Sequence, residues 1–120
     1  MERGKEKFVL VAFHCSGGHG DTFSVLGVFD ELSFVMAKIS DLQLRDGRFR
    51  MVSIDHGFFV YAIDLDQPYL FPERASENCI CCVRYQSGRH PEWKEEWFSL
   101  RYYSDMLKAG LIQRGLFVSR

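Results

Sequence analysis

Two runs of consecutive apolar residues predict strands that are buried on both faces. The first run spans 8–13 and the second spans 58–65, where Asp64 is the only charged residue. A strand with two apolar faces belongs inside a sheet rather than at its edge. The pattern therefore predicts two interior strands, one from each half of the chain.

A helical period follows the glycine-rich turn that comes after the first run. Asp21 or Thr22 can cap the helix, because a side-chain oxygen there accepts backbone N–H groups of the first turn. Gly27 weakens the helix by about 1 kcal/mol relative to alanine, so its regular part is expected to begin near Phe29. The apolar positions recur three and four residues apart, and they are Val28, Phe29, Leu32, Val35, Met36, Ile39 and Leu42.

The middle of the chain carries the signals of further strands. An uneven alternation over 48–55 predicts a half-exposed strand. His56 and Gly57 follow it, and a two-residue connection with glycine is typical of a hairpin that leads into 58–65. The thiol-rich and β-branched run 79–85 predicts a short additional strand.

The last third of the chain predicts a helix and a closing strand. Pro91 suits the first position of a helix, and Gly110 suits the position just after its end. Trp93 and Trp97 would lie on the core side of this helix at helical spacing. The run 115–119 predicts the final strand.

The element order indicates a fold class. Strand, helix, strand, strand, short strand, helix and strand follow the ferredoxin-like βαββ(β)αβ order with one extra strand. The 120 residues, of which 47% are apolar, suffice for one domain with a real core. We predict a single α+β domain over 1–120, with a mostly antiparallel sheet and two helices packed on one face.

This architecture predicts apolar surface that the chain cannot bury by itself. Two helices on one face would leave the other face of the sheet bare, with Phe59 and Tyr61 on it. Phe98, Tyr102 and Met106 would form a second apolar stripe on the last helix. Exposed apolar patches of more than a few hundred Å² normally mark binding sites. We predict these five residues as the contacts to a protein partner or to a second copy of the chain.

The charge and the cysteine content indicate which kinds of partner the protein binds and in which cellular compartment it is found. Fifteen basic and sixteen acidic residues give a net charge of −1, without the basic stripe that is typical of nucleic-acid binding. No apolar run approaches the ~20 residues of a membrane span. Four cysteines beside an ample core indicate reduced thiols. We expect a cytoplasmic protein that binds neither nucleic acid nor membrane.

The loop between the first strand and the first helix is rich in residues that can bind a ligand or a metal ion. His14, Cys15, His19 and Asp21 lie within eight positions, and we take them as candidate ligand-binding residues. Cys15 and His19 are candidate zinc ligands, because thiolate and imidazole suit a tetrahedral zinc site. A thiol enzyme would instead pair Cys79 with His56, since a nearby imidazole lowers the pKa of a thiol.

The first functional interpretation is a small intracellular protein-interaction or regulatory domain. It would act by binding a protein partner, would be homo-oligomeric and would need no cofactor, and we do not expect it to be an enzyme. The alternative is a metal- or thiol-dependent enzyme, or a small-ligand binder, centred on the loop from His14 to Asp21.

Overall fold

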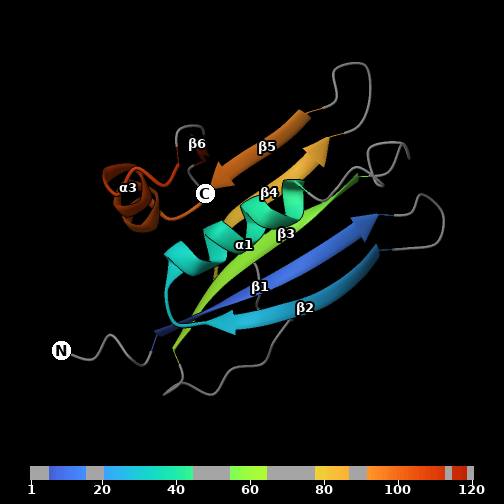
Figure 1. Cartoon of the computed structure of the whole chain (residues 1–120), viewed down its shortest axis with the longest axis horizontal. Coiled ribbons are helices and arrows are strands. Elements are labelled where there is room, and N and C mark those ends of the chain that lie inside the picture. Colours follow the sequence, from blue (N-terminus) through green and yellow to red (C-terminus); the bar gives the residue numbers. More distant parts are fainter. Residues whose placement is uncertain are drawn as a thin grey trace.

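The computed structural model describes residues 6–15, 21–44, 55–64, 78–86, 92–112 and 115–118, and the structural statements below concern these residues. The elements in them are shown in Figure 1. In chain order they are β1 (Glu6–Cys15), β2 (Asp21–Phe29), α1 (Leu32–Leu44), β3 (Asp55–Asp64), β4 (Cys79–Gln86), β5 (Glu92–Trp97), α3 (Leu100–Lys108) and β6 (Leu116–Phe117).

The described strands form one six-stranded sheet in the order β2-β1-β3-β4-β5-β6. Neighbouring strands are antiparallel, apart from the short parallel pair of β5 and β6. The two runs that are apolar on both faces became β1 and β3, which lie inside the sheet as predicted. The prediction of an α+β fold with a mostly antiparallel sheet is confirmed.

Both helices contribute to one core on the same face of the sheet. α1 crosses this face, and α3 lies toward the end of the sheet near β5 and β6 (Figure 1). The face of α1 that enters the core consists of Leu32, Val35, Met36 and Ile39, all of which the helical period had placed on one side. Trp97 of β5 is fully buried in this core, and Tyr102 brings α3 into it.

The ferredoxin-like order is not confirmed, because two stretches predicted as helix are strands. The first is β2, which occupies the predicted N-terminal half of the first helix. Phe23, Val25 and Val28 are aromatic and β-branched residues, which fit a pleated surface, and β1 pairs with β2 along its length. The helix begins only at Leu32.

The second misassigned stretch is β5, which occupies the start of the predicted last helix. Trp93 and Trp97 lie four residues apart, and a spacing of four keeps two side chains on one side of a helix and also of a strand. The periodicity could not separate the two structures. The end of the helix was predicted correctly, since α3 is followed by Gly110 with φ of +71°.

The predicted hairpin turn at His56 and Gly57 is wrong, because both residues lie within β3. A Cβ atom on Gly57 would lie 2.3 Å from the carbonyl oxygen of Val83 and 2.6 Å from Cα of Arg84. Glycine therefore permits close backbone approach here rather than a turn. Of the strand predicted over 48–55, only Asp55 is among the described residues, and it begins β3. The predicted strands at 79–85 and 115–119 correspond to β4 and β6.

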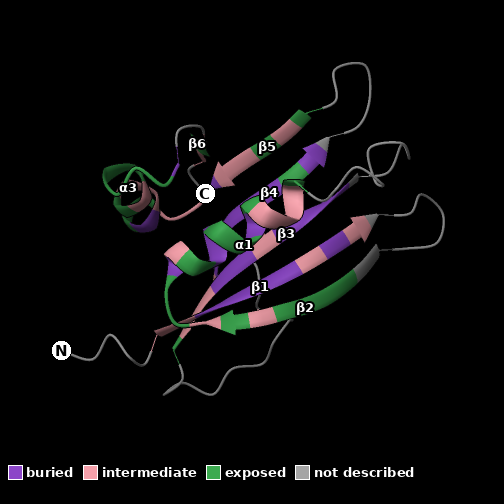
Figure 2. Cartoon of the chain, viewed as in Figure 1, coloured by how far each residue is buried: buried purple, intermediate pink, exposed green. Residues whose placement is uncertain are grey.

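The face of the sheet opposite the helices is called the second face below. It was predicted to be bare, and this prediction is wrong. Val9, Val11 and Tyr61 are only 2–6% exposed, and they form a second buried cluster with Cys79. Phe59 is half-buried against this cluster. Most described side chains of β2 are exposed, and this strand is largely green in Figure 2.

Candidate protein-interaction surface

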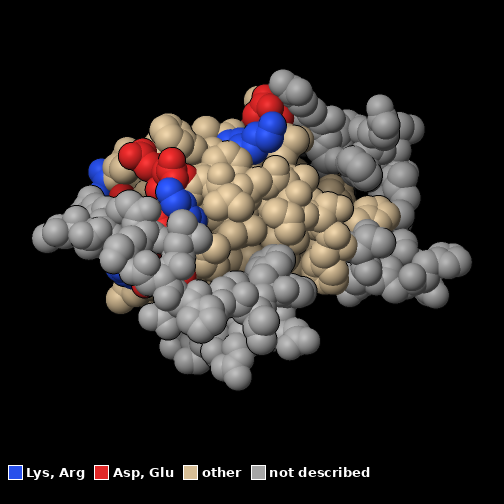
Figure 3. Space-filling model, turned by 90° about the horizontal axis from the view of Figure 1, so that it is seen from below, with Lys and Arg blue, Asp and Glu red and all other residues tan. Residues whose placement is uncertain are grey.

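β2 lies at the edge of the sheet that the described residues form. Among the described residues it pairs only with β1, along its nine residues. The outer edge of such a strand presents backbone N–H and C=O groups to solvent, and these groups can bind another strand. The stretch 22–29 contains no charged residue. Figure 3, seen from the β2 side, shows an uncharged surface with the described charges gathered at its margins.

The side chains of β2 add an apolar row to this edge. Phe23, Val25 and Val28 pair with Phe13, Val11 and Val9 of β1, so they lie on the second face. Single exposed apolar residues are ordinary, whereas a contiguous row indicates a binding surface. We call this row, together with the Leu26 bulge next to it, the β2 edge surface, and its exposed fractions are 60% for Phe23, 56% for Val25, 42% for Leu26 and 59% for Val28.

The β2 edge surface is continuous with the buried cluster of the second face. The ring of Phe59 stacks on that of Phe13, with centroids 4.7 Å apart, and the ring of Phe23 lies 6.5 Å from Phe59. Tyr61 continues the row at 6.2 Å from Phe59. Phe23 therefore lies beside a packed aromatic row, and Val25 and Val28 lie beside the buried Val11 and Val9.

The opposite edge of the sheet is protected, in contrast to β2. β6 is only two residues long, and its neighbour β5 carries charged residues at four of its six positions. Short edge strands and charged side chains are the usual devices that prevent unwanted strand pairing. β2 is nine residues long and has no charged residue over 22–29, although it contains a bulge at Leu26, which is a further such device. It is therefore the edge at which another strand can add.

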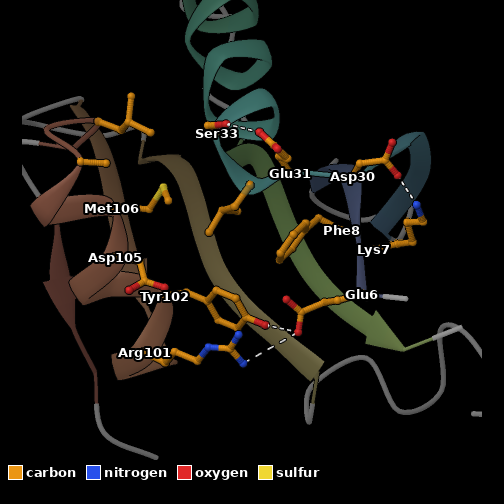
Figure 4. Close-up of a pocket in the computed structure, with 13 residues that line it drawn as sticks. Glu6, Lys7, Phe8, Asp30, Glu31, Ser33, Arg101, Tyr102, Asp105 and Met106 are labelled. Atoms are coloured by element: carbon orange, nitrogen blue, oxygen red, sulfur yellow. Dashed lines mark hydrogen bonds and ion pairs between the residues drawn. The ribbon is translucent and has the colours of Figure 1, made fainter. Parts of the chain in front are cut away.

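A groove of about 720 Å³ lies between the N-terminal end of β1, the start of α1 and α3 (Figure 4). Phe8, Leu32 and Met106 contribute apolar surface to it. The rings of Phe8 and Tyr102 meet edge to face, with centroids 5.6 Å apart. This volume falls within the range of ligand-binding pockets, so the groove is the second surface to consider.

The polar groups of the groove bind one another. The hydroxyl of Tyr102 donates a hydrogen bond to Oε2 of Glu6 at 2.5 Å, and the guanidinium of Arg101 lies 3.9 Å from the same oxygen. Lys7 and Asp30 form an ion pair at one side of the groove (Figure 4). Burial, with the hydrogen bond to Glu6, raises the pKa of the Tyr102 hydroxyl. These contacts tie α3 to β1, which is a structural role that needs no ligand.

The five residues predicted as partner contacts do not form one surface. Tyr102 and Met106 line the groove, while Phe59, Tyr61 and Phe98 belong to the second face. The expected exposure is wrong for Tyr61 and Tyr102, which are 6% and 9% exposed. Their part in partner binding stays a prediction. The β2 edge surface was missed, although the uncharged, β-branched stretch 22–29 carried its signal.

The structure describes only part of the loop that was predicted to bind a ligand. His14 lies in β1, whereas His19 and the side chains of Cys15 and Asp21 are outside the described residues. Strand pairing sets the backbone of Cys15 opposite both Asp21 and Asp55. It also sets His14 opposite His56, a neighbour that the sequence did not reveal. In the described ranges no three histidine, cysteine or acidic residues gather closely enough to hold a metal ion.

The thiol pair of Cys79 and His56 is wrong as a catalytic pair. Cys79 pairs with Tyr61 on β3, five residues from His56, which places the two roughly 17 Å apart at about 3.4 Å per residue. His56 is buried and packs against the rings of Tyr85 and Trp93. The thiols of β4 are buried as well, and burial raises the pKa of the Cys81 thiol. A raised thiol pKa opposes nucleophilic reactivity.

Within the described part of the chain, no helix combines the length and apolarity needed to cross a membrane. No known protein family, curated protein or solved structure matches the chain.

Proposed function

We propose that this protein is a small protein-interaction domain that binds an extended segment of a protein along the free edge of β2. The observation that supports this most directly is that β2 combines length, lack of charge and exposed apolar side chains. A nine-residue edge strand has no charge over 22–29 and carries four apolar side chains that are 42–60% exposed.

Binding of this kind uses the backbone for affinity and side chains for selectivity. The outer N–H and C=O groups of β2 would form the ladder with the added strand. Alternate side chains of that strand would then contact Phe23, Val25 and Val28 on the second face, because side chains alternate across a strand. The chemistry needs no cofactor.

The groove is the weaker candidate for the main binding site. Of the four acidic residues that line it, Glu6 and Asp30 are engaged by Tyr102, Arg101 and Lys7. A partner that binds at Glu6 or Asp30 would have to replace these contacts, which reduces the gain on binding. We therefore infer that the contacts in the groove stabilise the fold. The variant Leu111→Lys, described next, tests the groove as a binding site.

A capture experiment with three variants tests the proposal. The full chain is immobilised and exposed to cell extract and to untagged chain, and retained proteins are identified by mass spectrometry. Val25→Lys places a charge on the β2 edge surface. Phe34→Lys, at a position 57% exposed on α1, is the matched control, and Leu111→Lys, at a position 47% exposed, probes the groove.

We expect the wild type, Phe34→Lys and Leu111→Lys to retain the same proteins, and Val25→Lys to lose them. Far-UV circular dichroism checks that all variants remain folded. If nothing is retained by the wild type, or if Val25→Lys retains the same set, the edge is not the binding site. Loss with Leu111→Lys alone would move the site to the groove.

A further inference from the structure

The β2 edge surface is complementary to itself. Two copies of an edge strand can pair antiparallel about a two-fold axis, so that the same patch serves both partners. Such pairing is blocked when charged side chains meet their own copies, because like charges directly opposite are destabilising. Between Thr22 and Phe29 no charged residue is present, so the strand can meet its copy without this penalty.

The bulge at Leu26 sets which side chains of β2 share a face. It shifts the register, so that Phe23 and Val25 before it and Val28 after it all lie on the second face. In an antiparallel pair about the middle of β2, Phe23 of one copy meets the region of Val28 of the other. Opposite residues of a strand pair share a face. The exposed apolar rows of the two copies would thus pack against each other on the second face.

The exposed area of the β2 edge surface indicates how strongly two copies would bind each other. The four side chains of the β2 edge surface, about half exposed, present roughly 400 Å² per copy. A standard interface needs about 800 Å² per partner, and the backbone of β2 supplies only part of the difference. The contact lies at the low end of specific interfaces, where complexes are weak and reversible.

From this self-complementarity we infer that the partner of the β2 edge is a second copy of the chain. The two sheets join through antiparallel β2 strands into one continuous sheet, as a weak dimer that dissociates on dilution. This inference rests on the proposed function, because it names the partner of the same edge.

Sedimentation velocity on the full chain tests the inference between about 5 and 500 µM, the range in which a small interface dissociates. We expect the wild type and Phe34→Lys to shift from monomer to dimer across this range. Val25→Lys should raise the dissociation constant at least about tenfold, because it places like charges beside the two-fold axis.

A cysteine at the axis tests the geometry independently. Val25→Cys should form an intermolecular disulfide on mild oxidation, because Val25 and its copy lie diagonally across the axis with Cα atoms roughly 6 Å apart, a separation that a disulfide can span. Phe34→Cys, on the far side of the sheet, should not cross-link. The described native thiols, Cys79, Cys81 and Cys82, are buried and give a low background.

A wild type that stays monomeric up to the highest concentration would overturn the inference. A dimer that Val25→Lys leaves intact would overturn it too, because another surface would then carry the contact. The proposed function fails separately. If the chain is monomeric while extract proteins are captured and lost with Val25→Lys, the edge binds a different partner and only the dimer is wrong.

Discussion

Tyr102 joins α3 to β1 through one hydrogen bond, and that bond can be removed without changing the packing. Tyr102→Phe deletes the hydroxyl that donates to Glu6 and leaves the ring against Phe8. We expect the free energy of unfolding to fall by about 1 kcal/mol, the usual cost of a hydrogen bond. Urea denaturation measures the change. Tyr103→Phe is the control, because its hydroxyl makes only a 3.4 Å contact with the carbonyl oxygen of Gly115.

The same hydroxyl makes stability depend on pH. Burial, followed by the hydrogen bond to Glu6, raises the pKa of Tyr102. In the unfolded chain a tyrosine releases its proton near pH 10. Above that pH the unfolded state binds fewer protons than the folded state, so stability is lost as pH rises. We expect Tyr102→Phe to lose less stability than the wild type between about pH 9 and 11, and an equal loss in both would contradict this assignment.

Among the described glycines, Gly57 has the least room for a methyl group. Its position in β3 leaves no room for a Cβ atom between β3 and β4. We expect Gly57→Ala to cost about 3 kcal/mol, because the clash is with backbone atoms that cannot rotate away. Gly110→Ala is the comparison, since only its positive φ resists substitution there, at about 1–2 kcal/mol. Thermal unfolding followed by circular dichroism ranks the two, and a reversed order would contradict the structure.

At the scale of elements, α1 has one side that carries stability and one that does not. Ile39 is 2% exposed in the core, whereas Phe34 is 57% exposed on the same helix. We expect Ile39→Ala to cost about 2–4 kcal/mol and Phe34→Ala to stay within about 0.5 kcal/mol. Chemical denaturation distinguishes them. Similar costs for both would mean that α1 packs on the sheet with a different face.

The sequence predicts an element well where its side chains fit only one period. The interior strands β1 and β3 and the buried face of α1 were predicted because continuous apolar runs and a clear helical arc had no competing interpretation. β2 and β5 were misassigned for the opposite reason. Trp93 and Trp97 satisfy both periods, and the strand at Asp21–Phe29 depends on its pairing with β1. Pairing over distance is not visible in a local pattern.

The β2 edge surface was not predicted because β2 itself had been predicted as a helix. Read as part of a helix, Phe23, Val25 and Val28 cannot form one row; read as an edge strand, they do. Exposed large apolar side chains lie on β2 and also on α1, α3 and β6, but not at the five residues that were predicted as partner contacts. The location of the β2 edge surface required the strand order.

At the scale of the whole molecule, the sheet has two unequal edges. The β6 edge is short and lies beside the charged strand β5, whereas β2 is long, has no charged residue over 22–29 and carries exposed apolar side chains. Helices cover one face, and the aromatic cluster supports the β2 edge surface from the other. A molecule built this way directs strand pairing to a single edge.

Amide hydrogen exchange resolved by residue tests most directly whether that edge is open. In a dilute, monomeric sample we expect alternate amides of β2, those turned away from β1, to exchange almost as fast as unstructured amides, while β1 and β3 stay protected. These β2 amides should become protected when a strand is added. Protection of every β2 amide in the dilute monomer would show that the edge is already covered, and would contradict the account.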